Sequence, residues 1–312
     1  MRAAFRLKSL AFHSTPEIAI LDIYKEEAMP SFKHIVFPVD FSDRSNGAVP
    51  FVAEMARKQD ATVTLIAVAH LPNMELLEPF TIDPKPILDS LKSRLDQAYL
   101  SHFAGLEVDR LAVLGDPAQA IIDFVSANRV DLVMMATHGY TPFRQLLLGS
   151  VTAKVLHDVH VPVWTAAHTV EPPAREHVNI RKILCAVDTS AASVELMRWA
   201  AGLSKDLGAT LRLIHAVPGI EAWPDLQMDQ KFEDTLRENA THTIQNLEKD
   251  AGLSVPVCIG AGTVPDVVRE EALQHGADLI LIGRGTLHGT LGRLRTHAYG
   301  IIRHAPCPVL SV

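Results

Sequence analysis

The sequence contains two copies of one pattern of short apolar runs, about 147 residues apart. Residues 33–42, which begin Lys33-His-Ile-Val, recur as residues 181–190, which begin Arg181-Lys-Ile-Leu. In the same way, segments 61–68, 130–136 and 160–163 recur as 209–216, 277–283 and 306–309. An offset that stays nearly constant over so many segments indicates one duplicated domain rather than a short solenoid repeat.

Each copy alternates strand-like runs with amphipathic segments. Its apolar runs are nearly continuous, as expected of strands covered on both faces of a parallel sheet; in the first copy they are 35–39, 63–68, 132–135 and 161–164. Apolar residues at helical spacing predict a helix after the first strand of each copy: Ala48, Phe51, Val52, Met55 and Ala56 in the first, and Leu196, Trp199, Ala200, Leu203 and Leu207 in the second. Gly208 then stands where a helix C-terminal glycine is expected. The order βαβαβαβαβ with right-handed crossovers predicts an α/β fold with a doubly wound parallel sheet in each copy.

We predict four segments: a poorly ordered N-terminal extension (1–30), a first domain (31–166), a linker (167–179) and a second domain (180–312). The linker contains Pro172-Pro173, and paired prolines suit a short stiff connection. The last strands, 161–164 and 308–312, would leave apolar sheet edges, which attract pairing. Pairing one edge with the other predicts a pseudo-twofold arrangement within one chain, with a homodimer of chains as a further expectation.

Composition limits the kinds of partner. The formal net charge is -7 without a basic tract, which argues against nucleic acid as a partner. Three widely spaced cysteines are typical of reduced thiols in a cytoplasmic protein, and no apolar run approaches the roughly 18 residues of a membrane span. The first residues, Met1-Arg-Ala-Ala, resemble a basic leader without an apolar core. A non-core extension with Met29 as the natural start is therefore preferred to a targeting peptide.

The strongest chemical signal in the chain follows the fourth predicted strand of the first copy. There the sequence reads Gly139-x9-Gly149-Ser150, with a helix predicted to begin at the second glycine. A strand, a small-residue turn and a helix N-terminus together present bare backbone N–H groups to an anion, most naturally a phosphate.

Other candidate residues converge on the same edge, because ligands of doubly wound sheets bind at the carboxyl ends of the strands. Asp40 follows the first strand, Val68 ends the second, Gly115-Asp116-Pro117 follows the third, and His138 follows the fourth. Each has a structural alternative, since Asp40 suits a turn and Ser150 suits an N-cap. No nucleophile is placed against a general base, and no third ligand joins His157 and His160. The sequence therefore predicts neither a catalytic residue nor a metal site.

These residues resemble the universal stress protein (UspA) family in its tandem two-domain form, over residues 33–165 and 181–312. The family signature is Gly-x2-Gly-x9-Gly-Ser/Thr, with a strand-one Asp and a Gly-x-Pro turn. The resemblance implies a Rossmann-like fold, similar to other adenine-nucleotide α/β proteins, that binds ATP, alone or with Mg²⁺, mainly in the first domain. The nucleotide-binding residues that it implies are Pro38, Val39, Asp40, Val68, Val113, Gly115, Ala136, Thr137, His138, Gly139, Gly149, Ser150, Val151 and Thr152.

The chain departs from that signature in both copies. Ala136 stands at the first signature glycine, where its methyl group would crowd a ligand mildly. In the second copy Arg295-Thr296 stand where the first has Gly149-Ser150. An arginine there blocks close backbone approach, although its guanidinium could hold a phosphate differently. The alternative is a solvated or domain-contact loop that binds nothing. The second-domain counterparts are Asp188, Gly283, Arg284, Gly285, Arg295 and Thr296.

The expected function is a cytoplasmic stress-response regulatory or binding protein for ATP or a related adenine nucleotide. Two alternatives stay open. One is a slow ATPase or autophosphorylating protein, with Ser150 and Thr152 beside the phosphates. The other is a nucleotide-independent interaction protein, which Ala136 and the altered second loop favour.

Overall fold

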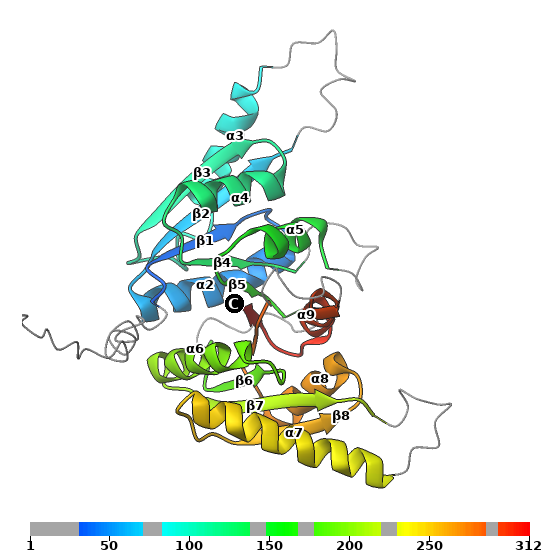
Figure 1. Ribbon diagram of the computed structural model, residues 1–312. Helices are drawn as coiled ribbons and strands as arrows, with labels where there is room; N and C mark the ends of the chain where they lie inside the picture. The colour runs from blue at the N-terminus through cyan, green and yellow to red at the C-terminus, as the bar shows by residue number, and fades with distance from the viewer. Residues whose placement is uncertain (1–30, 71–82, 138–147, 168–177, 220–229, 285–292) are drawn as a thin grey trace, which may run out of the picture.

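The computed structural model describes residues 31–70, 83–137, 148–167, 178–219, 230–284 and 293–312, without the side chains of Gln230 and of residues 293–296. The expected N-terminal extension, most of the expected linker, and His138, Gly139 and Gly285 lie outside the described residues. Within the described part, the chain forms a ten-stranded sheet in the order β3-β2-β1-β4-β5-β10-β9-β6-β7-β8, with helices on both faces (Figure 1).

The first half of the sheet belongs to the first copy. Its strands are β1 (His34–Pro38), β2 (Thr62–Ala69), β3 (Val108–Leu114), β4 (Leu132–Met135) and β5 (Val163–Thr165). Its helices are α2 (Asp43–Gln59), α3 (Lys85–Gln97), α4 (Pro117–Ala127) and α5 (Ser150–Asp158). The predicted alternation of strands and helices is confirmed, and the apolar runs became parallel strands buried on both faces.

The second half repeats this arrangement. Its strands are β6 (Lys182–Ala186), β7 (Thr210–Val217), β8 (Val257–Ala261), β9 (Leu279–Ile282) and β10 (Val309–Ser311). Its helices are α6 (Ala192–Leu207), α7 (Gln230–Asp250), α8 (Val264–His275) and α9 (Arg293–His304). Gly208 caps α6 with φ 64°, a backbone conformation that glycine adopts without steric cost, as the sequence predicts.

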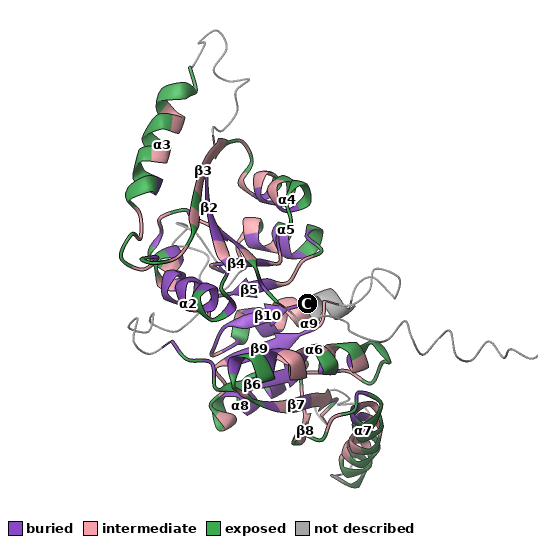
Figure 2. Ribbon diagram, turned by 90° about the vertical axis from the view of Figure 1, so that its left-hand side faces the viewer, coloured by how far each residue is buried: buried purple, intermediate pink, exposed green. Residues whose placement is uncertain are grey.

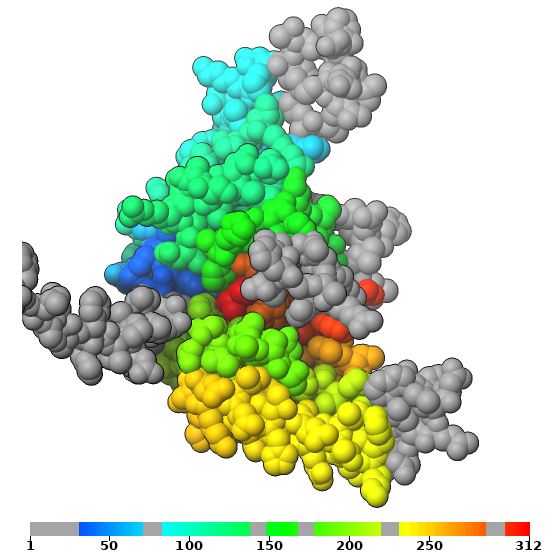
Figure 3. All heavy atoms as spheres, viewed as in Figure 1, coloured from blue at the N-terminus to red at the C-terminus, as the bar shows by residue number. Residues whose placement is uncertain are grey.

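The two halves meet where β5 pairs with β10. All pairings inside each half are parallel, but β5 and β10 are antiparallel, with Leu310 opposite Trp164. Two side-chain bonds repeat reciprocally across this seam: the Thr165 hydroxyl donates to Val309 O at 3.2 Å, and the Ser311 hydroxyl donates to Val163 O at 3.1 Å. These reciprocal bonds are what a pseudo-twofold axis between the halves produces. The space-filling view shows the red C-terminal segment at the waist between the halves (Figure 3).

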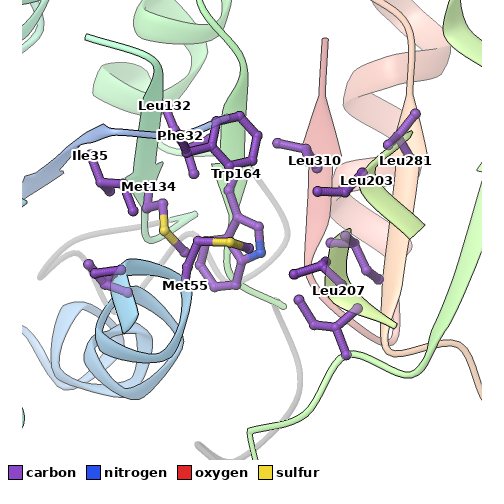
Figure 4. Packing of buried hydrophobic residues seen from close by; sticks show 14 of the residues in the cluster. Phe32, Ile35, Met55, Leu132, Met134, Trp164, Leu203, Leu207, Leu281 and Leu310 are labelled. Carbon is purple, nitrogen blue, oxygen red and sulfur yellow. The ribbon is translucent and has the colours of Figure 1, made fainter. Parts of the chain in front are cut away.

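Two apolar cores flank the sheet, and each runs through both halves. One lies under α2, α3, α6 and α7, and the other under α4, α5, α8 and α9. The inner strands are buried along most of their length, and the outermost strands β3 and β8 are mostly half-buried, whereas the outer faces of the helices are exposed (Figure 2). At the seam, Trp164 projects between Met55 of α2 and Leu207 of α6 (Figure 4). The core is therefore continuous from one half to the other.

Among the described residues, no helix combines the length and apolar character that crossing a membrane requires.

Truncation of Trp164 tests the importance of the seam. Its side chain is 0% exposed and its ring centroid lies 5.2 Å from that of Phe51. Because Trp164→Ala leaves a cavity between the halves, we expect it to lower the free energy of unfolding by about 3–5 kcal/mol. Chemical denaturation measures this loss. Leu273→Ala, on the exposed face of α8, is the control and should change stability by less than about 0.5 kcal/mol. Equal losses in the two variants would contradict the expectation.

Candidate functional site

The candidate site lies in the first half, at the point where the strand order changes direction. From β1 the chain passes to β2 on one side, and it later returns to place β4 on the other side. Crevices at such switch points, outside the carboxyl ends of the strands, are where doubly wound sheets bind ligands. Asp40 follows β1 by two residues, Ala136 directly follows β4, and Gly149 precedes α5.

The N-terminus of α5 is held against the end of β4 by two hydrogen bonds. The Gly149 amide donates to Thr137 O at 2.9 Å, and the Thr152 hydroxyl donates to Ala136 O at 3.0 Å. The N-cap, Gly149, has no side chain that could accept from the first helical amides. A helix start without a side-chain cap leaves amides available to an anion. By contrast, Asp116 accepts from the Gln119 amide at the start of α4.

A tight turn presents the carboxylate of Asp40 at this edge. One carboxylate oxygen accepts from the amide and the hydroxyl of Ser42, at 2.9 and 2.7 Å, while the residue stays exposed. Phe41 between them has φ 61°, which is uncommon for a bulky side chain, and the Arg94 guanidinium lies 3.9 Å from its ring centroid. The turn, with this cation–π contact beside it, fixes Asp40 in place.

The remaining predicted residues divide by the face of the sheet that they occupy. Val68 pairs with Val113, and both pack, as Val151 does, against the core under α4 and α5, on the side where α5 begins. Gly115 follows with φ 149°, a value that favours glycine. The side chain of Val39 instead enters the core under α2, so a ligand at this edge could meet only its backbone. Pro38 is half-buried beside it.

Thr137, Ser150 and Thr152 differ in what they offer a ligand. Ser150 is exposed at the first position of α5. Thr137 and Thr152 are buried, at 2% and 3% exposure, and the hydroxyl of Thr152 is already bonded to Ala136 O. The geometry therefore makes Thr152 a residue that positions α5, and it leaves Ser150 as the hydroxyl open to solvent.

In the second half, Asp188 is tied more tightly into its turn than Asp40. Its carboxylate oxygen accepts from the amide and hydroxyl of Ser190 and from the hydroxyl of Ser193. Burial alone would raise the pKa of Asp188, but these hydrogen bonds and nearby His215 outweigh burial and lower it. In the first half, the equivalent Ser45 has a buried hydroxyl without a partner among the described residues.

The walls of the two sites also differ. Gly260 pairs with Ala216 at the position where Val113 pairs with Val68. A Cβ placed on Gly260 would lie 2.3 Å from Cγ1 of Val267, so the Val267 side chain occupies this space. Gly283 directly follows β9, as Ala136 follows β4, while the side chains of Arg295 and Thr296 lie outside the described part of the chain.

Arg284 of the second copy contacts the first half of the molecule. Its guanidinium donates to Val159 O at 2.8 Å, to Val161 O at 2.6 Å and to Leu156 O at 3.4 Å. All three acceptors lie at or just beyond the C-terminal end of α5, in the first half. The sequence left two alternatives for the cationic loop, a phosphate contact or a domain contact. Arg284, which the structure describes, makes a domain contact. Sequence reasoning missed the acceptors, because a carbonyl far along the chain leaves no signal in residue type.

The comparisons with known proteins agree with this fold. The model of the universal stress protein family matches residues 31–166 and 179–312. Universal stress protein MJ0531 of Methanocaldococcus jannaschii is 30% identical over 155 residues, covering 46% of this chain and 85% of that protein. Universal stress protein MJ0577 of the same organism is 26% identical over 156 residues, covering 42% of this chain and 93% of that protein. A crystal structure of a universal stress protein from Archaeoglobus fulgidus covers 90% of this chain and 97% of its own, with a TM-score of 0.64 and 21% identity.

The fold defines the class of protein: it consists of two doubly wound α/β units, each with a helix N-terminus at its switch point. The family model matches the chain in two consecutive stretches that together span most of it. The chain belongs to the universal stress protein family, in a tandem form, as the sequence motifs predict.

The turn at Asp188 predicts a pH-dependent contribution to stability. Since the pKa of this carboxyl is lower in the folded chain than its ordinary value of 3.8, its ionised form stabilises the fold. This stabilisation is complete above the ordinary pKa and is lost as pH falls through the lower folded value. We expect Asp188→Asn to lower the urea midpoint at pH 7 and to differ less from the unsubstituted protein near pH 3. A difference that stays the same at both pH values would contradict this.

Proposed function

We propose that this protein binds ATP or a related adenine nucleotide in its first half, alone or with Mg²⁺, and acts as a regulatory binding protein. The observation that carries the proposal is the uncapped N-terminus of α5, bonded to the end of β4 beside the Asp40 turn. Family membership supports the same ligand, because the sequence keeps Asp40, the Gly115-x-Pro117 turn and Gly149-Ser150 of the nucleotide signature.

In this proposal each part of the edge has one task. The amides at the start of α5 would hold phosphate oxygens, with the exposed hydroxyl of Ser150 beside them. Asp40 would accept from the adenine or ribose, and Val68 and Val113 would line the apolar side. His138 and Gly139 belong to the proposed phosphate loop on sequence grounds.

The second half offers a poorer site for the same ligand. Asp188 has one carboxylate oxygen committed to three hydrogen bonds, and Val267 fills the space beside Gly260. Arg295 replaces the glycine that lets a phosphate approach the backbone. We therefore propose one nucleotide for each chain rather than two.

The sharpest test of the phosphate position is Gly149→Arg, measured by isothermal titration with ATP, with and without Mg²⁺. Gly149 has φ -59° and ψ 144°, backbone angles that any residue adopts, so the variant should fold. The long side chain would cover the first amides of α5. We expect one ATP per chain for the unsubstituted protein, and affinity at least about tenfold weaker in Gly149→Arg, which is ~1.4 kcal/mol.

Arg295→Gly is the matched control, since it makes the reverse change at the equivalent position of the second half. We expect it to leave both the affinity and the stoichiometry unchanged. Equal affinity of Gly149→Arg and the unsubstituted protein would remove the proposed phosphate position. A nucleotide-free protein whose melting temperature does not change in ATP would instead support the nucleotide-independent interaction protein, because a ligand selective for the folded state must stabilise it.

Asp40→Asn and Asp188→Asn form a second matched pair. Both change a strand-one carboxylate to an amide of the same shape, but only Asp40 lies at the proposed site. We expect Asp40→Asn to weaken ATP binding by about tenfold, the loss of one hydrogen bond to a charged group, while Asp188→Asn binds like the unsubstituted protein. Equal effects of the two substitutions would place the adenine elsewhere. Phosphate release that vanishes in Ser150→Ala would assign the protein to the slow ATPase class.

We also propose that the seam forms within one chain and that the domains are residues 31–166 and 180–312, joined by 167–179, in a cytoplasmic protein. The reciprocal bonds of Thr165 and Ser311 support pairing inside the chain, because each half already supplies the other's missing edge. A single chain of 34.1 kDa would then be complete without a partner copy. Sedimentation equilibrium measures this mass. A homodimer at low concentration would contradict the monomer but not the seam, because two chains can associate through other surfaces.

A further inference from the structure

The α5 helix connects the proposed phosphate position to the second half of the molecule. Its nine residues span about 13 Å, from Ser150, next to Gly149 at the candidate site, to Asp158 near the seam. At the first end it is bonded to Thr137 O and Ala136 O of its own half. At the other end, the bonds that hold it come from the second half.

Arg284 supplies the main contact at that end. A helix leaves its last carbonyls without partners in the helix, and those carbonyls carry the negative end of the helix dipole. The Arg284 guanidinium is cationic and donates to Leu156 O in the last turn of α5, to Val159 O at the C-cap, and to Val161 O just beyond it. Burial lowers the pKa of Arg284, but a guanidinium stays protonated in proteins.

A second contact comes from α9. The Tyr299 hydroxyl donates to Ala153 O at 3.2 Å, near the middle of α5. The backbone of Arg284 is itself fixed, since its amide donates to Val312 O at 2.8 Å beside β10. The second half therefore contacts α5 from the side, through Tyr299 of α9, and at its C-terminal end, through Arg284, whose backbone is bonded beside β10.

The first copy has a different residue at this position, although the two copies repeat one sequence pattern. Thr137 occupies the position of Arg284 in the first copy, directly after Ala136 as Arg284 follows Gly283. It is buried at 2% exposure, and its carbonyl accepts from Gly149. A threonine side chain is several atoms shorter than an arginine, so it cannot span to α9 as Arg284 spans to α5. Thr137 therefore makes no contact with the second half equivalent to that of Arg284 with the first.

We propose that Arg284 is a positioning residue for the nucleotide site of the other half. The second copy, whose own glycine loop has diverged, would use the residue after Gly283 to hold α5 and keep its N-terminus in place. Nucleotide binding in the first half is then coupled to the packing of the second. This coupling to the ligand rests on the proposed function, but the hold on α5 does not.

The test compares Arg284→Met with Arg284→Lys. Methionine keeps the apolar stem without donors, and lysine keeps the charge but not the planar fork that reaches several carbonyls. Hydrogen exchange of the ligand-free protein should show α5 amides from Ala153 to Val159 exchanging about tenfold faster in Arg284→Met, with Arg284→Lys between the two. ATP affinity should fall by about three- to tenfold in Arg284→Met, the usual range for coupling through packed elements.

Arg198→Met is the matched control. Arg198 also donates to a backbone carbonyl, that of Asp250 at 2.7 Å, but within the second half. It should change neither α5 exchange nor ATP affinity. Unchanged α5 exchange in Arg284→Met would overturn the inference, as would acceleration spread equally over α2 and α6.

The two proposals fail in different ways. Absence of ATP binding by the unsubstituted protein would remove the proposed function, while the exchange measurement still decides whether Arg284 holds α5. Faster α5 exchange with unchanged ATP affinity would overturn the coupling, because Arg284 would then cap a helix without positioning the site.

Discussion

The antiparallel pairing of β5 with β10 is the contact on which the rest of the structure depends. Each half is a parallel sheet whose last strand would otherwise be an open apolar edge. Pairing the two edges makes one sheet and joins the cores on both of its faces, with Trp164 and Leu310 opposite each other at the centre. It also brings α5 within reach of Arg284 and Tyr299, which unpaired halves would not contact.

Within this shared frame the two halves have diverged in chemistry. Both keep an aspartate after the first strand, but Asp40 is exposed, whereas Asp188 accepts three hydrogen bonds and is half-buried. Both keep a small residue after the fourth strand, but the residue that follows is a buried threonine in one and an interdomain arginine in the other. The two copies thus keep the same sheet while the residues at the carboxyl ends of their strands make different contacts.

Much of the fold was predictable from sequence, because parallel strands buried on both faces must be apolar and the duplication repeats the signal. The candidate site was predictable only in part. Asp40 and Gly149 were predicted from their places after a strand and before a helix, and the structure has them at those places. The roles of Val39 and Thr152 were not, because strand alternation sends Val39 into the opposite core and a hydroxyl's partner depends on packing.

The sequence by itself determined the family, the doubly wound class and the difference between the two glycine loops, because each is written in residue type and spacing. Only the tertiary structure decided which side chains lie at this edge of the sheet and which contact the other half. Arg284 shows the physical reason: its three acceptors are backbone carbonyls between 123 and 128 residues away. Every residue carries a backbone carbonyl, so residue type does not show which carbonyls Arg284 contacts. The pairing of β5 with β10 brings these three within its reach.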